Sequence, residues 1–202
     1  MKKILILGSK GQLGSHLTLT LSKDNLVQGL TRVDCDFFNE KKLENLVKTF
    51  DPSLIINCVA YTNVDKAEFE KSIAYKVNVV FNQIICNICN RNNIWLMHFS
   101  TDFVFKGDSL KPIIESEICN PINFYGESKR NGELVIMNSM KQYTIIRLSG
   151  VYSKQANNFP MKIIQKLKEN KQVSVVDDQT GSPTSVYFIA NVIQIWVKKF
   201  FL

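Results

Sequence analysis

The sequence predicts an α/β fold, a Rossmann-like doubly wound parallel sheet with helices on both faces. Three observations predict it. Short apolar runs alternate with helical stretches along the whole chain. The first apolar run leads directly into a glycine-rich turn. The 202 residues are 45% hydrophobic and 21% charged, an ordinary globular composition for a single domain with a small appendage.

The first half of the chain is expected to alternate strand and helix three times. The predicted order is strand 2–8, helix 12–22, strand 26–32, helix 40–50, strand 53–60 and helix 68–91. The first strand, "KILILG", carries Ile and Leu on both faces, as buried parallel strands do. Asn39 is expected to open the second helix, which closes before Pro52. The long third helix ends in an Asn-rich turn.

The second half continues the alternation. The predicted order is strand 94–100, helix 125–139, strand 143–152, helix 158–170, strand 172–178 and helix 186–200. The last stretch is apolar enough to raise the question of a membrane segment. Asn191, Gln194 and two lysines interrupt it, so we expect a helix packed by one face and no membrane association.

The net charge of +7 comes from positive residues that are scattered along the chain. No basic run with interleaved aromatic residues is present, which argues against a nucleic-acid partner. A moderate positive field favours phosphorylated small molecules as ligands.

Cys86 and Cys89 form a CxxC pair, which could be a redox or metal site. They fall within a predicted helix, and no second pair or nearby histidine completes a zinc site. Buried free thiols in a reducing compartment are therefore expected, with no metal. The apolar run at the N-terminus is too short for a signal peptide and meets a glycine loop, so a cytoplasmic location is predicted.

The segment "ILGSKGQLGSH" places Gly8, Gly11 and Gly14 directly after the first strand and at the start of the first helix. Backbone amides in such a turn, together with the helix dipole, bind a pyrophosphate. Gly8 allows the tight turn, Gly11 lets the backbone approach the phosphates, and Gly14 lets helix and strand pack closely. This segment predicts a dinucleotide site.

The residue that follows the second strand distinguishes the two nicotinamide dinucleotides. An acid there binds a free ribose 2′-hydroxyl, whereas an arginine accommodates a 2′-phosphate. Here the strand ends in Thr31 and Arg32, with no acid before Asp34. NADP(H) is therefore the preferred cofactor and NAD(H) a possible one. Asp36 and Phe37 follow in position to cover the adenine.

Tyr125 and Lys129 share one face of a predicted helix, a spacing that by itself is common on exposed helices. With a dinucleotide at the N-terminus and Thr101 at the carboxyl edge of the sheet, the trio resembles the extended branch of the short-chain dehydrogenase/reductase superfamily. In that superfamily the tyrosine is the acid or base on the substrate oxygen, which Ser or Thr also binds. The lysine lowers the pKa of the tyrosine and holds the nicotinamide ribose.

Six segments in this order are similar to the dTDP-4-dehydrorhamnose reductase family over essentially the whole chain. They are "GSKGQLG", "NCVAYTNVDKAE", "STDFVF", "NPINFYGESKRNGE", "NNFPMKII" and "VVDDQTGSPT". The resemblance implies reduction of the 4-keto group of a dTDP-linked 6-deoxysugar to dTDP-L-rhamnose, with a nucleotide-sugar substrate and a possible homodimer. It also implies an NAD(P)-binding domain over 1–155 and a partial substrate-binding part over 156–202, packed on that domain.

The resemblance assigns roles to individual residues. The cofactor-binding residues would be Gly8, Gly11, Gln12, Leu13, Gly14, Asp36, Phe37, Ala60 and Tyr61, together with Tyr125 and Lys129 of the catalytic trio. Thr101 completes that trio. The substrate side would comprise Asp102, Phe103, Asn158, Phe159 and Gln179, together with Asp178 and Pro183.

Three departures from the family pattern affect the substrate side. Gly150 stands where a Trp is expected, Phe103 replaces a Tyr, and the chain stops at Leu202 while the family continues. Weak binding of dTDP-sugars, with low or absent turnover by this chain alone, is therefore expected, and three alternatives stay open. The first is a non-catalytic nucleotide-binding or regulatory subunit, and the second is a short homologue acting on another nucleotide sugar. The third is an epimerase or dehydratase of the same fold, of which the dehydratase is disfavoured because Phe103 follows Asp102 where an acidic pair would be usual.

Overall fold

Five strands form a parallel sheet whose order is β2-β1-β3-β4-β5. They are β1 Lys3–Leu7, β2 Leu26–Leu30, β3 Leu54–Asn57, β4 Trp95–Thr101 and β5 Tyr143–Leu148. The computed structural model describes residues 1–109, 111–154, 158–170 and 172–200. The parallel pairing confirms the doubly wound sheet that the sequence predicts.

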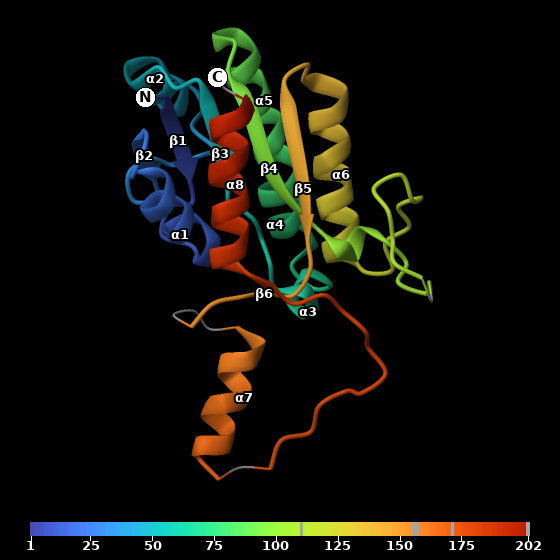
Figure 1. Ribbon diagram of the computed structural model, residues 1–202. Coiled ribbons are helices and arrows are strands. Elements are labelled where there is room, and N and C mark those ends of the chain that lie inside the picture. Colours follow the sequence, from blue (N-terminus) through green and yellow to red (C-terminus); the bar gives the residue numbers. More distant parts are fainter. Residues whose placement is uncertain (110, 155–157, 171, 201–202) are drawn as a thin grey trace.

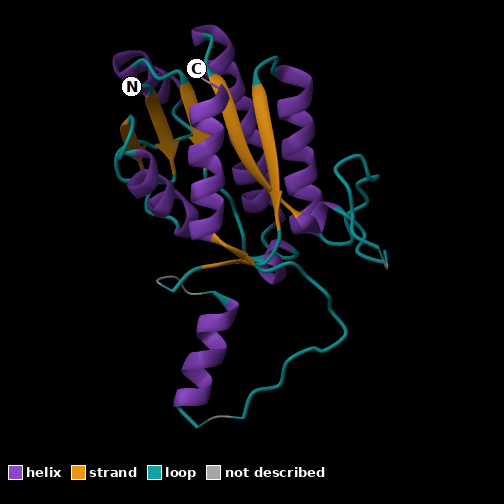
Figure 2. Cartoon of the chain, viewed as in Figure 1, coloured by secondary structure: helices purple, strands orange, loops and turns teal. Residues whose placement is uncertain are grey.

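Helices cover both faces of this sheet (Figures 1 and 2). On one face lie α1 Gln12–Leu21 and α8 Val186–Phe200; on the other lie α2 Glu40–Phe50, α5 Phe81–Asn92 and α6 Phe124–Ser139. The alternation of side chains along β1 explains the two layers. Ile4 and Ile6 join the core under α1 and α8, whereas Leu5 and Leu7 join the core under α2 and α5.

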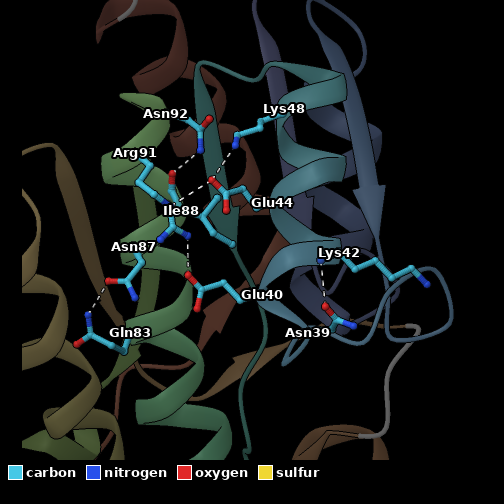
Figure 3. Close-up of polar contacts among 10 residues, drawn as sticks. All are labelled: Asn39, Glu40, Lys42, Glu44, Lys48, Gln83, Asn87, Ile88, Arg91 and Asn92. Atoms are coloured by element: carbon cyan, nitrogen blue, oxygen red, sulfur yellow. Dashed lines mark hydrogen bonds and ion pairs between the residues drawn. The ribbon is translucent and has the colours of Figure 1, made fainter.

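Polar contacts link the outer surfaces of α2 and α5 (Figure 3). Arg91 of α5 pairs with Glu40 and, at 3.2 Å from Nε to Oε1, with Glu44 of α2. Asn39 caps α2 by accepting from Lys42 N at 3.0 Å, as predicted. Exposed pairs of this kind stabilise little, so the buried apolar face supplies most of the packing energy.

The predicted helix over 68–91 begins at Lys71 rather than at residue 68, and it runs without a break to Asn92. It consists of α4 Lys71–Tyr75, the π-helical turn η1 Lys76–Val80 and then α5, and the short α3 Val64–Ala67 precedes it. Asn63 begins α3 by accepting from Lys66 N at 3.0 Å. The π turn contains Asn78, whose side chain bonds both backbone groups of Tyr61. The spacing of apolar residues along the sequence does not reveal that tertiary contact.

Two predicted strands also need correction. The strand over 143–152 is interrupted at Gly150, where φ is +50°. It resumes as the short β6 Val151–Tyr152, which pairs with β7 Thr184–Ser185. Residues 172–178 form no strand despite their valines, and most of them are exposed. Strand propensity is effective only where a neighbouring strand supplies a partner.

The C-terminal elements differ in how they are packed. The helix α7 Phe159–Lys168 projects away from the sheet (Figure 1) and buries no side chain. In contrast, α8 buries Ile189, Ile193 and Val197 against the sheet.

The predicted boundary at residue 155 falls on 155–157, outside the described residues, and the two-part division stays a prediction. Cys86 and Cys89 are buried free thiols in α5, as expected. No helix in the described ranges is both long and apolar enough to cross a membrane.

Close packing of α6 on η1 and α5 depends on Gly132. A Cβ added there would lie 2.2 Å from Asn78 O and 2.6 Å from Asn82 Nδ2. Overpacking of this kind costs about 1–3 kcal/mol, whereas alanine inside a helix gains only about 1 kcal/mol over glycine.

We therefore expect Gly132→Ala to lower the free energy of unfolding by about 1–2 kcal/mol in urea denaturation. Gly181→Ala is the control, because its added Cβ would have only Ser149 Oγ nearby, at 3.8 Å, and should change stability by less than about 0.5 kcal/mol. A Gly132→Ala protein as stable as wild type would show that α6 tolerates a wider separation from η1.

Candidate active site

The glycine loop joins the carboxyl end of β1 to the first turn of α1. Gly8 has φ of +79°, a conformation that favours glycine, and its amide donates to Leu30 O at 2.8 Å. A Cβ on Gly14 would lie 2.3 Å from Gly8 O, so close helix packing requires glycine there. Gly11 is the residue before α1. The loop thus presents the start of a helix to the crevice above β1 and β3, the switch point of the sheet.

A cavity of about 810 Å³ lies on the β2 side of this loop. Arg32, Asp36, Phe37, Ala60 and Tyr61 line it with Gly8 and Gly11. Asp34 turns back on Thr31, accepting from its amide and its hydroxyl at 2.7 Å each. Of Thr31, Arg32 and Val33, which line this cavity directly after β2, Arg32 is the charged one.

A second cavity, of about 570 Å³, lies on the β4 side and brings the predicted catalytic trio together. Thr101, Tyr125 and Lys129 line it with Gly11, Gln12 and Leu13. The two cavities share Gly11 and the segment 58–60 with Thr62, so they form one groove along the carboxyl edge of the sheet. A groove of this shape, with the glycine loop at its middle, fits an extended dinucleotide.

The predicted substrate residues divide into two groups. Asp102, Phe103, Asn158 and Phe159 line the second cavity. Asp102 Oδ1 accepts from Thr101 Oγ1 at 3.0 Å, and its other oxygen accepts from Ser149 Oγ. Asn158 Nδ2 donates to Gln12 Oε1 at 3.2 Å, which links the start of α7 to the glycine loop.

The structure does not bring the remaining substrate candidates into the cavity. Asp178 and Gln179 are exposed, and neither lines the two cavities beside the glycine loop. Pro183 Cα would lie 3.2 Å from a Cβ placed on Gly150. Gly150 itself lines the second cavity where the family pattern has a Trp.

Tyr125 is buried in the second cavity, with 8% of its surface exposed. Burial raises the pKa of its phenol, a hydrogen bond from Thr101 opposes the rise, and the negative charge of Asp102 adds to it. Phe103 packs edge-on against the ring at 5.6 Å between centroids. A phenol with a raised pKa is protonated at neutral pH and suits a proton donor.

Lys129 is more deeply buried, with 2% of its surface exposed. Its Nζ donates to Phe99 O at 2.7 Å and lies 3.2 Å from His98 Nε2. Burial lowers the pKa of this amine to about 8. The lowering of the Tyr125 pKa by Lys129 that the resemblance implies is absent from this arrangement, because Lys129 is bonded to β4 instead.

A ladder of buried amides behind the trio was missed by the sequence analysis. Asn57 Nδ2 donates to Asn82 Oδ1 at 3.0 Å, and Asn82 Nδ2 donates to Asn78 O at 2.8 Å. Asn78 Nδ2 donates to Ser128 Oγ at 2.9 Å, and Ser128 Oγ donates to Tyr125 O at 2.8 Å. The only available signal was the presence of polar residues inside otherwise apolar elements.

Comparison with known proteins identifies the relatives of this chain. It is 34% identical over 195 residues to the dTDP-4-dehydrorhamnose reductase of Salmonella typhimurium, covering 93% of this chain and 64% of that protein. It is 35% identical over 182 residues to the dTDP-4-keto-6-deoxy-D-glucose reductase of Streptomyces niveus, covering 89% and 63%. The chain thus spans somewhat less than two thirds of the length of these relatives.

A solved structure agrees with these matches. The dTDP-4-dehydrorhamnose reductase of Bacillus anthracis, in complex with NADP, superposes with a TM-score of 0.93 at 34% identity, covering 98% of this chain and 71% of that one. The family model described as the RmlD substrate binding domain matches residues 1–201. The resemblance read from the motifs is therefore confirmed, and the chain belongs to the RmlD substrate-binding domain family.

Proposed function

We propose that this chain carries the cofactor and catalytic groups for NADPH-dependent reduction of the 4-keto group of a dTDP-linked 6-deoxysugar. One observation carries the proposal: Thr101, Tyr125 and Lys129 share a cavity that is continuous with the glycine loop. The names of the relatives supply the substrate class. The exact sugar, the L-rhamnose product and a homodimer are parts of this proposal that rest on the resemblance. A cytoplasmic location is a part of it that rests on the free thiols.

The dinucleotide would lie along the groove with its pyrophosphate at the glycine loop. From there the dinucleotide would pass Gln12 and Leu13 into the second cavity, where Lys129 would hold the nicotinamide ribose. Arg32 would face the ribose 2′-phosphate, while Asp36 and Phe37 would cover the adenine. Ala60 and Tyr61 would pass beneath the middle of the cofactor.

The chemistry divides between the cofactor and three side chains. The groove would hold NADPH, which would supply a hydride to carbon 4 of the sugar and so leave negative charge on the attached oxygen. Tyr125 gives its phenolic proton to that oxygen, and the Thr101 hydroxyl would turn from Asp102 to donate a hydrogen bond to it. Since burial raises the pKa of Tyr125, the phenol holds its proton until this charge develops. Lys129, as an ammonium drawn off its β4 partners, would then stabilise the phenolate that remains.

The substrate side would be formed by Asp102, Phe103, Asn158 and Phe159 around the same cavity. Gln179 would contribute only if the exposed segment 172–182 moved toward the sugar. A non-catalytic nucleotide-binding subunit would share the groove but would need no proton donor inside it. The burial of both Tyr125 and Lys129 beside Thr101 in this cavity favours the enzyme.

The role of Tyr125 predicts a large loss of rate on removing one oxygen. Tyr125→Phe should reduce turnover of a dTDP-4-keto-6-deoxysugar about 10²–10⁴-fold, the usual contribution of general acid catalysis, while NADPH affinity stays unchanged. Turnover is followed by NADPH absorbance. Tyr75→Phe makes the same change on an exposed tyrosine of α4 and should be neutral. Near wild-type turnover by Tyr125→Phe would mean that another group protonates the product.

The role of Arg32 predicts a change in cofactor preference. Arg32→Ala should weaken NADPH binding about 10–100-fold, since a hydrogen bond to a charged group is worth about 1.5–3 kcal/mol. NADH binding should change by less than about twofold, because it has no 2′-phosphate. Fluorescence titration measures both, with Lys41→Ala on the exposed side of α2 as the charge-matched control. Equal losses for the two cofactors would remove this role, and no binding by the wild type would refute the dinucleotide site.

The burial of Lys129 at the proposed catalytic site predicts that its effect on the free energy of unfolding depends on pH. Its pKa is about 8 in the folded chain against 10.5 for the free side chain. Below pH 8 the folded state holds a disfavoured charge, and above 10.5 neither state is charged. The stability of Lys129→Met relative to wild type should therefore fall by about 3 kcal/mol between pH 8 and 10.5. Denaturant unfolding at several pH values measures this, and a difference independent of pH would contradict it.

A further inference from the structure

His98 lies on β4 beneath the catalytic lysine and is 1% exposed. Its Nδ1 is 3.2 Å from Asn57 Nδ2, and its Nε2 is 3.2 Å from Lys129 Nζ. Neither partner is an obvious acceptor, because an amide nitrogen always donates and a charged amine only donates. The protons of this chain of three side chains must therefore be assigned from the groups around them.

Backbone groups fix the orientation of both amides in the ladder. Val59 N donates to Asn57 Oδ1 at 3.0 Å, so the nitrogen of Asn57 must point toward His98 and Asn82. Asn82 is fixed in the same way, because its Nδ2 donates to Asn78 O at 2.8 Å. Turning either amide over would oppose two donors or two acceptors in a buried site, at a cost of about 1–3 kcal/mol for each unmade bond.

The tautomer of His98 follows from these orientations. Asn57 Nδ2 presents a hydrogen to His98 Nδ1, which must then carry a lone pair. The proton of the neutral ring is consequently on Nε2, directed at Lys129 Nζ. An ammonium at that position would oppose one donor with another at 3.2 Å, whereas a neutral amine would accept from Nε2 and still donate to Phe99 O.

We propose that Asn57 fixes His98 as its Nε2–H tautomer, and that His98 acts as a positioning residue which favours the neutral amine of Lys129 while the two are in contact. Drawing Lys129 off His98, toward a ligand in the groove, removes the opposed donor. Above about pH 8, where the buried amine is neutral, it then takes a proton from solvent, and the hydrogen bonds from His98 Nε2 and to Phe99 O are both broken. Proton uptake by Lys129 is in this way coupled to its departure from β4.

The other charged and titratable groups around Lys129 do not account for a preference for its neutral amine, which we therefore assign to His98. Glu133, one turn along α6, is paired with Arg130 and Arg147 at 2.8 Å each. The Cys58 thiol, after β3, has its pKa raised to about 12 by burial and is neutral. Tyr125 is a protonated phenol near neutral pH, and Asp102 accepts from Thr101 and Ser149. Burial of His98 lowers the pKa of its ring, which keeps the imidazole neutral.

The tautomer is measurable in the wild-type chain. The sequence has only two histidines, His16 and His98, so the imidazole signals in a two-bond proton–nitrogen NMR spectrum are assigned by their loss in His16→Gln. His98 should show a protonated Nε2 and a bare Nδ1, unchanged from about pH 8 to pH 5. A protonated Nδ1, or a ring that titrates in this range, would overturn the proposal.

A second measurement tests the effect on the lysine. In His98→Gln the amide can turn its oxygen toward Lys129, which replaces an opposed donor with an acceptor. The titration of Lys129, followed by its side-chain NMR signals and assigned with Lys129→Met, should move up by about one pH unit, a tenfold rise in proton affinity. An unchanged or lowered midpoint would overturn the proposal, and the wild-type tautomer still decides if the variant does not fold. The catalytic meaning rests on the proposed function, but no substrate or cofactor enters either experiment. Absence of reductase activity would therefore refute the function and leave this inference standing.

Discussion

The buried amide ladder is the constraint on which the rest of the site depends. Asn57 ends β3, Asn78 lies in the π turn η1, and Asn82 lies in α5. Each is 1% exposed, so each must find its hydrogen-bond partners within the protein. The ladder therefore fixes the ends of β3 and η1 relative to α6, and the π turn exists where Asn78 reaches both backbone groups of Tyr61.

The parallel sheet explains why the site forms at one edge. The strands point the same way, so the glycine loop after β1, the segment after β3 and Thr101 at the end of β4 all reach the carboxyl edge. The order of strands reverses direction between β1 and β3, which opens a crevice there. Tyr125 and Lys129 approach this crevice on α6, held close by Gly126 and Gly132, where an added Cβ would meet backbone atoms.

Two buried ionisable groups on α6, Glu133 and Lys129, have opposite surroundings. Glu133 is enclosed completely but is bonded by two arginines, and these bonds hold the pKa of its carboxyl below its usual range. Lys129 is buried beside a neutral histidine and a carbonyl, with no carboxylate paired to it in the described part of the chain. The first arrangement satisfies a charge, whereas the second disfavours one. Uncompensated burial of an ionisable group is typical of functional sites, which trade stability for reactivity.

The sequence by itself determined the elements whose signals are local. The apolar runs located β1 to β5, Asn39 located the start of α2, and the glycine spacing located the loop that Gly8 and Gly14 require. The Tyr125–Lys129 spacing placed both side chains on one face of α6, because residues four apart are neighbours on a helix. The family motifs then identified the relatives.

Only the tertiary structure decided the features that depend on partners distant in sequence. The helix over 71–92 contains a π turn at Asn78, whose side chain bonds Tyr61. Residues 172–178 are not a strand because no strand in the described part of the chain pairs with them. Lys129 bonds β4 rather than Tyr125, and Asn57 selects the tautomer of His98, 41 residues away. A periodic pattern reports which face of an element is apolar. It carries no information about which buried polar groups form hydrogen bonds across the core, and the chemistry of this site depends on those hydrogen bonds.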